Sequence, residues 1–416
     1  WPQVSRRYMQ SFERARTEHL FFAQAEFAVK PLDKRTGDLP PLKLDHLHNM
    51  TDETGIFQHA IFTVPNYREG YTTDDNARAL MVSALLEESG SDEAAGMATR
   101  YLAFTWFAFN AETNRFRNFM DYQRNWLEDT GSDDSHGRSL WALGTVLGCS
   151  NTPTLQNMAG RMFEKSLMAI LDTTSPRAWA FALLGIHKYL GRFAGDRRVG
   201  QVEEKLAGRL LELYQNNRAD DWVWFEDKLT YCNAAISHAM LLCGQSLENP
   251  EMTRAGLDSL LWLAHLQQSE KEGKHYVPIG SNGFYPRGGE RARFDQQPVE
   301  AQAMVSACLE ANRITGDRNW YKEARRAFEW FLGRNDLHLP VYDPTTGGCR
   351  DGLHPDRVNE NQGAESTLAF LQALLELKLT ENITKIEEYT HNEQSHPGII
   401  STKQPESNID GVRLAI

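Results

Sequence analysis

The chain has 416 residues, of which 41% are hydrophobic and 24% charged, and its formal net charge is −12. Those fractions are typical of a globular protein and argue against a largely disordered one. The acidic balance argues against a nucleic acid or an anionic membrane as the partner, because both favour a basic protein face. We recognise no signal peptide and no long apolar run, so we expect no membrane-spanning segment. The expected location is cytoplasmic, or periplasmic if a signal has been removed.

The first 41 residues are expected to form an N-terminal helix, over Val4–Phe22, and a linker rich in Lys and Pro. A polar tail is expected at 389–416, where Pro and Ser follow a run of charged residues. The main domain is therefore predicted to occupy residues 42–388.

Within this domain the sequence repeats a helical hairpin. Polar segments rich in Gly, Asp, Asn or Pro introduce helices rich in small residues, at 71–80, 131–140, 174–179, 229–235, 294–302 and 359–367. Amphipathic helices are predicted between them, at 93–107, 154–171, 198–214, 252–268 and 320–332. The openings recur every 40 to 65 residues or so, roughly the length of a helical hairpin with variable loops.

Six helical pairs predict an all-α fold, an (α/α)6 barrel with parallel inner helices. Such a ring gathers six helix N-termini at one mouth, where free N–H groups and helix dipoles favour oxygen-rich ligands. The alternative is an open solenoid that binds proteins, but solenoid repeats usually keep one period and these do not.

Two pairs of adjacent aspartates open the first two inner helices. Glycoside cleavage requires one protonated and one ionised carboxyl group, and crowding drives the pKa values of neighbouring carboxyls apart. We predict Asp75 and Asp134 as the acid/base or nucleophile pair. The alternative candidates are Asp74, Asp133, Glu226 and Glu365. Alternatively, one aspartate of each doublet can cap its own helix. In the first doublet, Arg78 would then pair with the aspartate that is not the cap.

Aromatic and polar side chains are expected around the same mouth. Sugars stack their C–H faces on aromatic rings, while their hydroxyls form hydrogen bonds with charged groups. The predicted substrate-binding residues are His136, Arg78, Tyr71, Trp222, Trp224, Tyr231, Gln296, Glu300 and Glu360. Some have structural alternatives, because Trp222 and Trp224 can fill the core and Glu300 can cap its own helix.

No metal or cofactor is expected. The five cysteines are scattered, form no CxxC pair and lack histidines at metal-ligand spacing, so free thiols are predicted. The sequence contains no phosphate-binding Gly-rich loop, dinucleotide fingerprint, nucleophile elbow or HExxH helix. The oligomeric state is left open.

Over residues 42–380 the sequence resembles the six-hairpin glycosidase superfamily. Asp74-Asp75 at a helix start looks like the adjacent aspartates of bacterial endo-α-mannanases. The placement of Asp75 and Asp134 is similar to that in unsaturated glucuronyl hydrolases, which use aspartates on the first two inner helices.

Shorter segments resemble other sugar enzymes. Gly70-Tyr-Thr-Thr-Asp-Asp-Asn-Ala-Arg78 and Asp295-Gln-Gln-Pro-Val-Glu-Ala-Gln302 resemble a bacterial group associated with glycosyltransferases and mannoside metabolism. The first eight residues resemble the closing helix of a nucleotide-sugar glycosyltransferase. The resemblance to the bacterial group implies a mannose-containing oligosaccharide as the substrate.

Three functions are therefore weighed, and a glycoside hydrolase with a carbohydrate substrate leads. A sugar 2-epimerase uses the same barrel but requires two opposed histidines, for which His136 and His238 are the candidates. A non-catalytic carbohydrate-binding module attached to a glycosyltransferase would have aromatic lining without a perturbed carboxylate pair. Retention or inversion depends on the distance between the carboxyl groups.

Overall fold

The computed structural model describes residues 38–91, 93–270 and 274–395. The helix predicted at Val4–Phe22 and most of the predicted tail lie outside these residues. From Leu42 onward the described residues belong to one compact unit. Its described part is mostly helical, and none of the helices described is both long and apolar enough to cross a bilayer.

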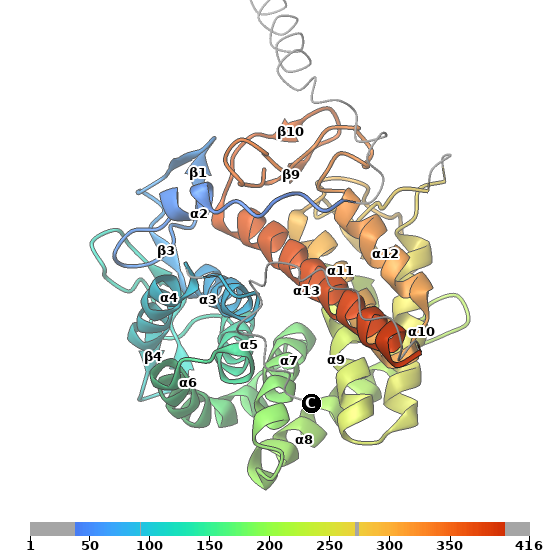
Figure 1. The fold of residues 1–416 in the computed structure, drawn as a ribbon, viewed down its shortest axis with the longest axis horizontal. Helices are drawn as coiled ribbons and strands as arrows, with labels where there is room; N and C mark the ends of the chain where they lie inside the picture. Colours follow the sequence, from blue (N-terminus) through green and yellow to red (C-terminus); the bar gives the residue numbers. More distant parts are fainter. Residues whose placement is uncertain (1–37, 92, 271–273, 396–416) are drawn as a thin grey trace, which may run out of the picture. The chain divides into compact units, whose positions relative to one another are not determined.

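Six helices form a closed inner ring (Figure 1). Each packs on the next, and the last packs on the first, so the predicted (α/α)6 barrel is confirmed. The inner helices are α3 (Thr73–Glu88), α5 (Asp133–Cys149), α7 (Pro176–Arg192), α9 (Asn233–Ser246), α11 (Pro298–Thr315) and α13 (Ala364–Ser395). Each begins within the polar segment predicted to open it, and α13 continues past the barrel end predicted at residue 388.

An outer layer of helices surrounds the ring, each packed on the inner helix that precedes it in the chain. The long outer helices are α4 (Ala94–Ala108), α6 (Pro153–Ser166), α8 (Arg197–Asn217), α10 (Pro250–Leu266) and α12 (Arg318–Glu329). A 3-10 turn, η2 (Leu167–Asp172), extends α6. Against α13, the described outer layer contributes only the short helix α2 (Asp45–Asn49).

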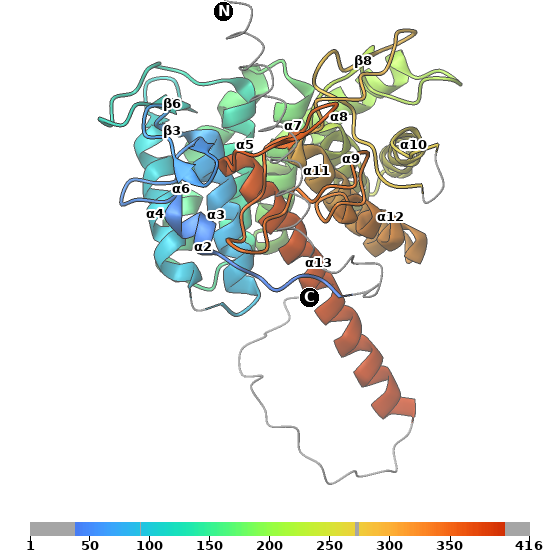
Figure 2. The same ribbon diagram turned by 90° about the horizontal axis from the view of Figure 1, so that it is seen from above.

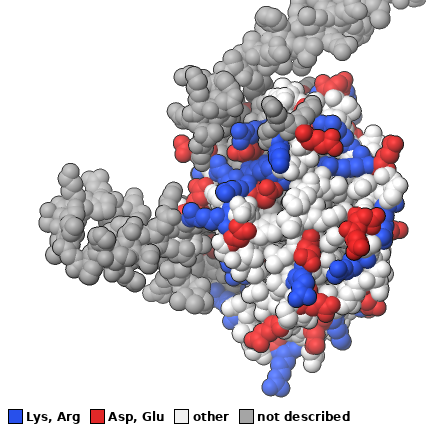
Figure 3. All heavy atoms as spheres, turned by 90° about the vertical axis from the view of Figure 1, so that its right-hand side faces the viewer, with Lys and Arg blue, Asp and Glu red and all other residues white. Residues whose placement is uncertain are grey.

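The two layers differ in their burial patterns. Residues 77–86 of α3 are all buried, because an inner helix contacts its ring neighbours, its outer partner and the barrel interior. The outer helix α12 instead buries only one stripe, which consists of Ala324, Ala327 and Phe328. On the face of the molecule shown in Figure 3, acidic and basic side chains are interspersed.

The connections into the inner helices contain the short strands. These form two-residue antiparallel pairs: β1 (Ala60–Ile61) with β2 (Val64–Pro65), β3 (Tyr71–Thr72) with β6 (Phe119–Met120), β4 (Phe109–Asn110) with β5 (Arg115–Phe116), β7 (Lys228–Leu229) with β8 (Tyr285–Pro286), and β9 (Gly352–Leu353) with β10 (Val358–Asn359). Connections from inner to outer helices run only a few residues. The long loops therefore gather at the N-terminal end of the ring, where β3, β6 and β8 lie in Figure 2.

The helices α5 and α7 approach each other closely through glycines. A Cβ atom on Gly144 would overlap the carbonyl oxygen of Gly185, and one on Gly185 would overlap that of Leu140. The backbones are therefore in direct contact at this crossing, and no side chain larger than hydrogen fits there.

We expect Gly144→Ala to destabilise the protein by at least about 2 kcal/mol, because the two helices must move apart to admit the methyl group. The matched control is Gly208→Ala on α8, where a Cβ would meet nothing within 4 Å. That change should stabilise the protein by about 0.5 kcal/mol or more through helix propensity. Thermal melts compare the two variants, and equal melting temperatures would contradict the close-packing argument.

Candidate functional site

A cavity of about 520 Å³ opens at the N-terminal end of the inner ring. Its lining includes five carboxyl groups and two guanidinium groups, those of Asp74, Asp75, Asp134, Asp351, Glu365, Arg78 and Arg138. They come from α3, α5, α13 and the loop before α13. The described residues contain no cluster of three or more His, Cys, Asp or Glu that could hold a metal ion. All five cysteines are free.

The residues preceding the two aspartate doublets cap the helices. Thr72 Oγ1 accepts a hydrogen bond from the Asp75 N–H at 3.0 Å and donates one to Asp75 Oδ2 at 2.7 Å. Ser132 Oγ accepts from the Ser135 N–H at 3.1 Å. The alternative in which the aspartates are N-caps is therefore wrong. Their side chains lie in the first helical turn, at the positive end of the helix dipole.

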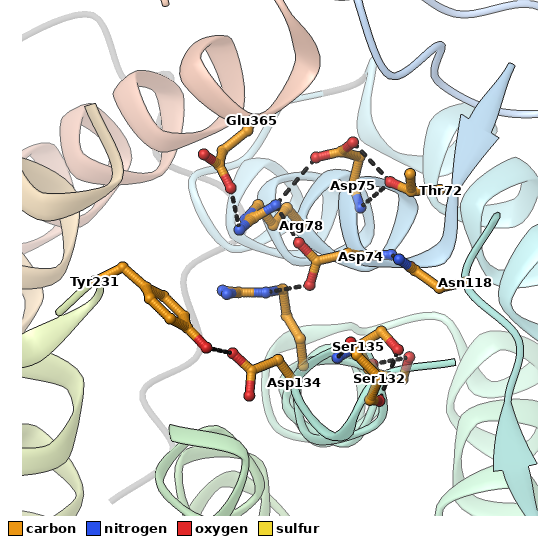
Figure 4. Close-up of polar contacts among 12 residues, drawn as sticks. Thr72, Asp74, Asp75, Arg78, Asn118, Ser132, Asp134, Ser135, Tyr231 and Glu365 are labelled. Atoms are coloured by element: carbon orange, nitrogen blue, oxygen red, sulfur yellow. Dashed lines mark hydrogen bonds and ion pairs between the residues drawn. The ribbon is translucent and has the colours of Figure 1, made fainter. Parts of the chain in front are cut away.

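Arg78 binds three carboxylates at once (Figure 4). Its Nη1 lies 2.5 Å from Asp74 Oδ2 and 3.0 Å from Asp75 Oδ1, and its Nη2 lies 2.6 Å from Glu365 Oε2. On the neighbouring helix, Arg138 Nε binds the other Asp74 oxygen at 2.5 Å. Both arginines are nearly completely buried. The two aspartates thus share one guanidinium nitrogen, and Asp74 joins two guanidinium groups.

This network separates the pKa values of the two adjacent aspartates. Burial raises the pKa of Asp75 to about 7. The positive charge of Arg78 lowers this pKa, whereas the nearby negative charges of Asp74 and Glu365 raise it. Burial also opposes ionisation of Asp74, but Arg138 and Arg78 together lower its pKa below the usual value. Near neutral pH, Asp75 therefore holds a proton part of the time while Asp74 is ionised.

Asp134 has a different environment. It accepts hydrogen bonds from Ser175 Oγ at 2.7 Å and from the Tyr231 hydroxyl at 2.5 Å. Burial, together with the charge of Asp134, raises the pKa of Tyr231, so that phenol stays a donor. No ion pair joins Asp134 to a described Arg, Lys or His, and its two oxygens are therefore oriented by neutral hydroxyls.

Arg138 is a site residue that the sequence did not single out. Its guanidinium lies over the Phe181 ring, 4.0 Å from the centroid, and only Nε pairs with Asp74. Within the described chain, no hydrogen bond or ion pair engages its two terminal nitrogens. A buried guanidinium with spare donors at a cavity wall is equipped to bind ligand oxygens.

Several other lining residues were not among the predicted site residues, and most of them lie in the loops before the inner helices. They are Gln58, His59, Asn118, Phe119, Gln297, Asp351, Asn359 and Ser366. Asn118 holds α3 in place by accepting from the Asp74 N–H at 3.1 Å. Asp351 accepts from the Gly363 N–H and from Ser366 Oγ, both at 2.8 Å. The polarity of these loops was visible in the sequence, but their pairing was not.

The prediction that Trp222 and Trp224 face the cleft is wrong. Trp222 is 2% exposed and packs edge-on against Trp262 and Tyr285. Trp224 is completely buried and contacts Phe225. Both indoles fill the core because the loop before α9 folds back onto the outer helices.

Three more predicted binding residues are buried away from the cavity lining. His136 packs beside Phe116, and burial lowers its pKa to about 3, so it is neutral. The Tyr71 hydroxyl donates to Asp52 at 2.6 Å. Gln296 is held between Trp330 and Asp336, each at 2.8 Å. Their polar atoms face the interior and not a ligand.

The remaining predicted acidic residues lie outside the cavity lining and serve other partners. Asp133 binds Arg115 at 2.8 Å, Glu226 binds Arg177 at 2.8 Å, and Glu360 binds Arg350 at 2.7 Å. Glu300 does not cap its own helix but accepts a hydrogen bond from the N–H of Cys232, the residue before α9, at 2.5 Å. Burial raises the pKa of Glu300 to about 7. Of the predicted residues, Asp74, Asp75, Arg78, Asp134, Tyr231 and Glu365 line the cavity.

Sequence comparison matches the chain to no family model and to no curated protein. Solved structures do match its fold. The cellobiose 2-epimerase of Bacillus thermoamylovorans is 12% identical with a TM-score of 0.62, and the match covers 82% of this chain and 96% of that one. The GH76 α-mannanase of Bacteroides thetaiotaomicron is 10% identical with a TM-score of 0.55, covering 76% and 88%.

A third match is an α-1,6-mannanase from a Salegentibacter species, 12% identical with a TM-score of 0.55, covering 81% of this chain and 96% of that one. That structure is an inactive variant, with two consecutive aspartates changed to alanine, in complex with α-1,6-mannotetrose. The chain thus has the (α/α)6-barrel fold of these epimerase and mannanase structures.

Proposed function

We propose that the protein is a glycoside hydrolase that cleaves a neutral, mannose-containing oligosaccharide at the barrel mouth. The observation that carries the proposal is the buried carboxyl of Asp75, whose pKa is raised to about 7 beside ionised neighbours in an open cavity. Glycosidases need this combination of a proton-bearing acid and an ionised carboxylate. The mannanases among the matching structures support the sugar class.

In this proposal Asp75 is the general acid that protonates the departing glycosidic oxygen. Asp134 is the base or nucleophile, because neutral hydroxyls orient its oxygens and none of the described arginines forms an ion pair with it. Asp74 acts as a positioning residue. Both of its oxygens bind guanidinium groups, and its charge helps to keep the proton on Asp75.

The charge of the lining favours a neutral sugar. Five carboxyl groups face two guanidinium groups, so an anionic sugar would be repelled even with Asp75 protonated. The spare terminal nitrogens of Arg138 are suited to donate to adjacent sugar hydroxyls. A neutral oligosaccharide satisfies these donors without adding negative charge to an acidic cavity.

The 2-epimerase alternative rests on the epimerase fold matches. It requires two opposed histidines at the sugar. Among the described lining residues of the cavity, His59 is the one histidine. His136 is in the core, and His238 lines a small hollow of about 10 Å³ that also includes Phe181 and Ser306. The raised pKa of Asp75 also argues against a module that only binds sugar.

We expect Asp75→Asn and Asp134→Asn each to lower kcat on mannosyl oligosaccharides by roughly a hundredfold or more, the usual contribution of an acid or base. Binding should persist, because both amides keep the shape of the carboxyl group. The matched control is Asp133→Asn, in the same doublet as Asp134 but paired with Arg115 outside the lining; it should stay within a fewfold of wild type. Full activity of either first variant would refute the assignment.

We expect Asp74→Asn to shift the pH profile. The rate should fall as pH rises through the pKa of Asp75, about 7 in the wild type. Removing the Asp74 charge frees Arg78 and Arg138 to stabilise ionised Asp75, which lowers its pKa. The basic limb of kcat/KM should therefore move to lower pH, while activity at acidic pH persists. Loss of activity at every pH with rescue by azide would instead identify Asp74 as the nucleophile.

A further inference from the structure

We infer that a second sugar-binding subsite lies on an aromatic rim beside the cavity, formed by Tyr67 and Tyr122 over Phe57. The inference rests on the proposed function and deepens it, because the rim would bind further units of the same neutral oligosaccharide. The substrate is then a chain that extends out of the cavity rather than a disaccharide held wholly inside it.

The rim is a preformed stack of rings. The Tyr67 and Tyr122 rings are 5.0 Å apart between centroids with an interplanar angle of 3°. Phe57 supports them from below, 4.7 Å from Tyr67 and 6.0 Å from Tyr122, and is itself buried. Tyr67 is nevertheless 51% exposed and Tyr122 46% exposed. Two tyrosines are therefore fixed in a parallel arrangement and still present ring surface to solvent.

Backbone contacts join the rim to the cavity wall. Gln58 and His59 line the cavity directly after Phe57, and the Asn66 N–H next to Tyr67 donates to the His59 carbonyl at 2.8 Å. On the other side, Phe119 also lines the cavity and pairs in register with Thr72, the cap of the Asp75 helix. Tyr122 follows in the same loop. The two loops that carry the rim tyrosines therefore also contribute residues to the cavity wall beside Asp75.

The chemistry of the rim suits a sugar ring. Tyrosine offers a broad apolar face for sugar C–H groups and a hydroxyl for their oxygens. Its two side-chain torsions cost little conformational entropy on binding, and here the neighbouring ring already restricts them. The nearby hairpin residues Ile61, Phe62 and Val64 are also exposed, but they are aliphatic or lie outside the ring stack. The paired rings that adjoin the cavity favour a glycan over a protein partner.

The test measures affinity against chain length. The Asp75→Asn variant, which should bind without turnover, is titrated calorimetrically with α-1,6-linked mannobiose, mannotriose, mannotetraose and mannohexaose. We expect affinity to rise with length. Adding Tyr67→Ala or Tyr122→Ala should weaken binding of the tetraose and hexaose by about tenfold and leave mannobiose unchanged. Tyr122→Phe should retain most of the increase in affinity with chain length, because the aromatic ring remains.

The matched control is Phe193→Ala, an exposed aromatic residue after the C-terminal end of α7, away from the mouth. It should not change any affinity. If all lengths bind but the tyrosine variants bind them as tightly as the parent does, the rim subsite is wrong and the hydrolase proposal stands. If none of the mannosides binds, both the proposed substrate and the rim subsite are refuted.

Discussion

The site depends on the burial of two arginines against Asp74. A buried guanidinium is tolerated only when carboxylates or other acceptors compensate its charge, and removing one partner leaves an uncompensated ion. Asp74 on α3 binds both Arg78 of its own helix and Arg138 of α5. Arg78 in turn binds Glu365 of α13. One ionic network therefore fixes three inner helices relative to one another at the mouth. Burial raises the pKa of Asp75 there, and the charges of Asp74 and Glu365 raise it further.

The barrel fold brings the residues of this network to one end of the ring. Inner helices that run parallel place their N-termini at one end, and the long strand-bearing loops gather at that end too. At this end the first-turn side chains meet the positive helix dipoles, which favour carboxylates. The ring must close for that to happen. Arg138 of α5 then contacts both neighbours of its helix, because its guanidinium lies over Phe181 of α7 and its Nε binds Asp74 of α3.

The sequence predicted the inner helices well, because each has a local signal: a polar opening, a cap and small residues. It also placed Asp75 and Asp134 at the mouth, since the first turn of an inner helix lies at that end of the ring. Trp222 and His136 were misplaced, because local sequence does not tell whether an aromatic or polar side chain faces a cleft or the core. Asp351 and Phe119 were missed because they reach the cavity through loop contacts with residues distant in sequence. Local chemistry could be predicted, but long-range pairing could not.

Hydrolases and epimerases share this fold, so the side chains at the mouth of the barrel, and not the fold, determine the reaction. Proton transfer beside a sugar carbonyl calls for bases that stay neutral and exchange protons near pH 7, which histidines do. Here the candidate histidines His136 and His238 lie outside the cavity lining, and burial lowers the pKa values of both. Carboxyls occupy the mouth instead, and arginines hold some ionised while burial keeps another protonated. An arrangement that separates carboxyl pKa values in this way is suited to cleaving an acetal, which needs an acid and a carboxylate together.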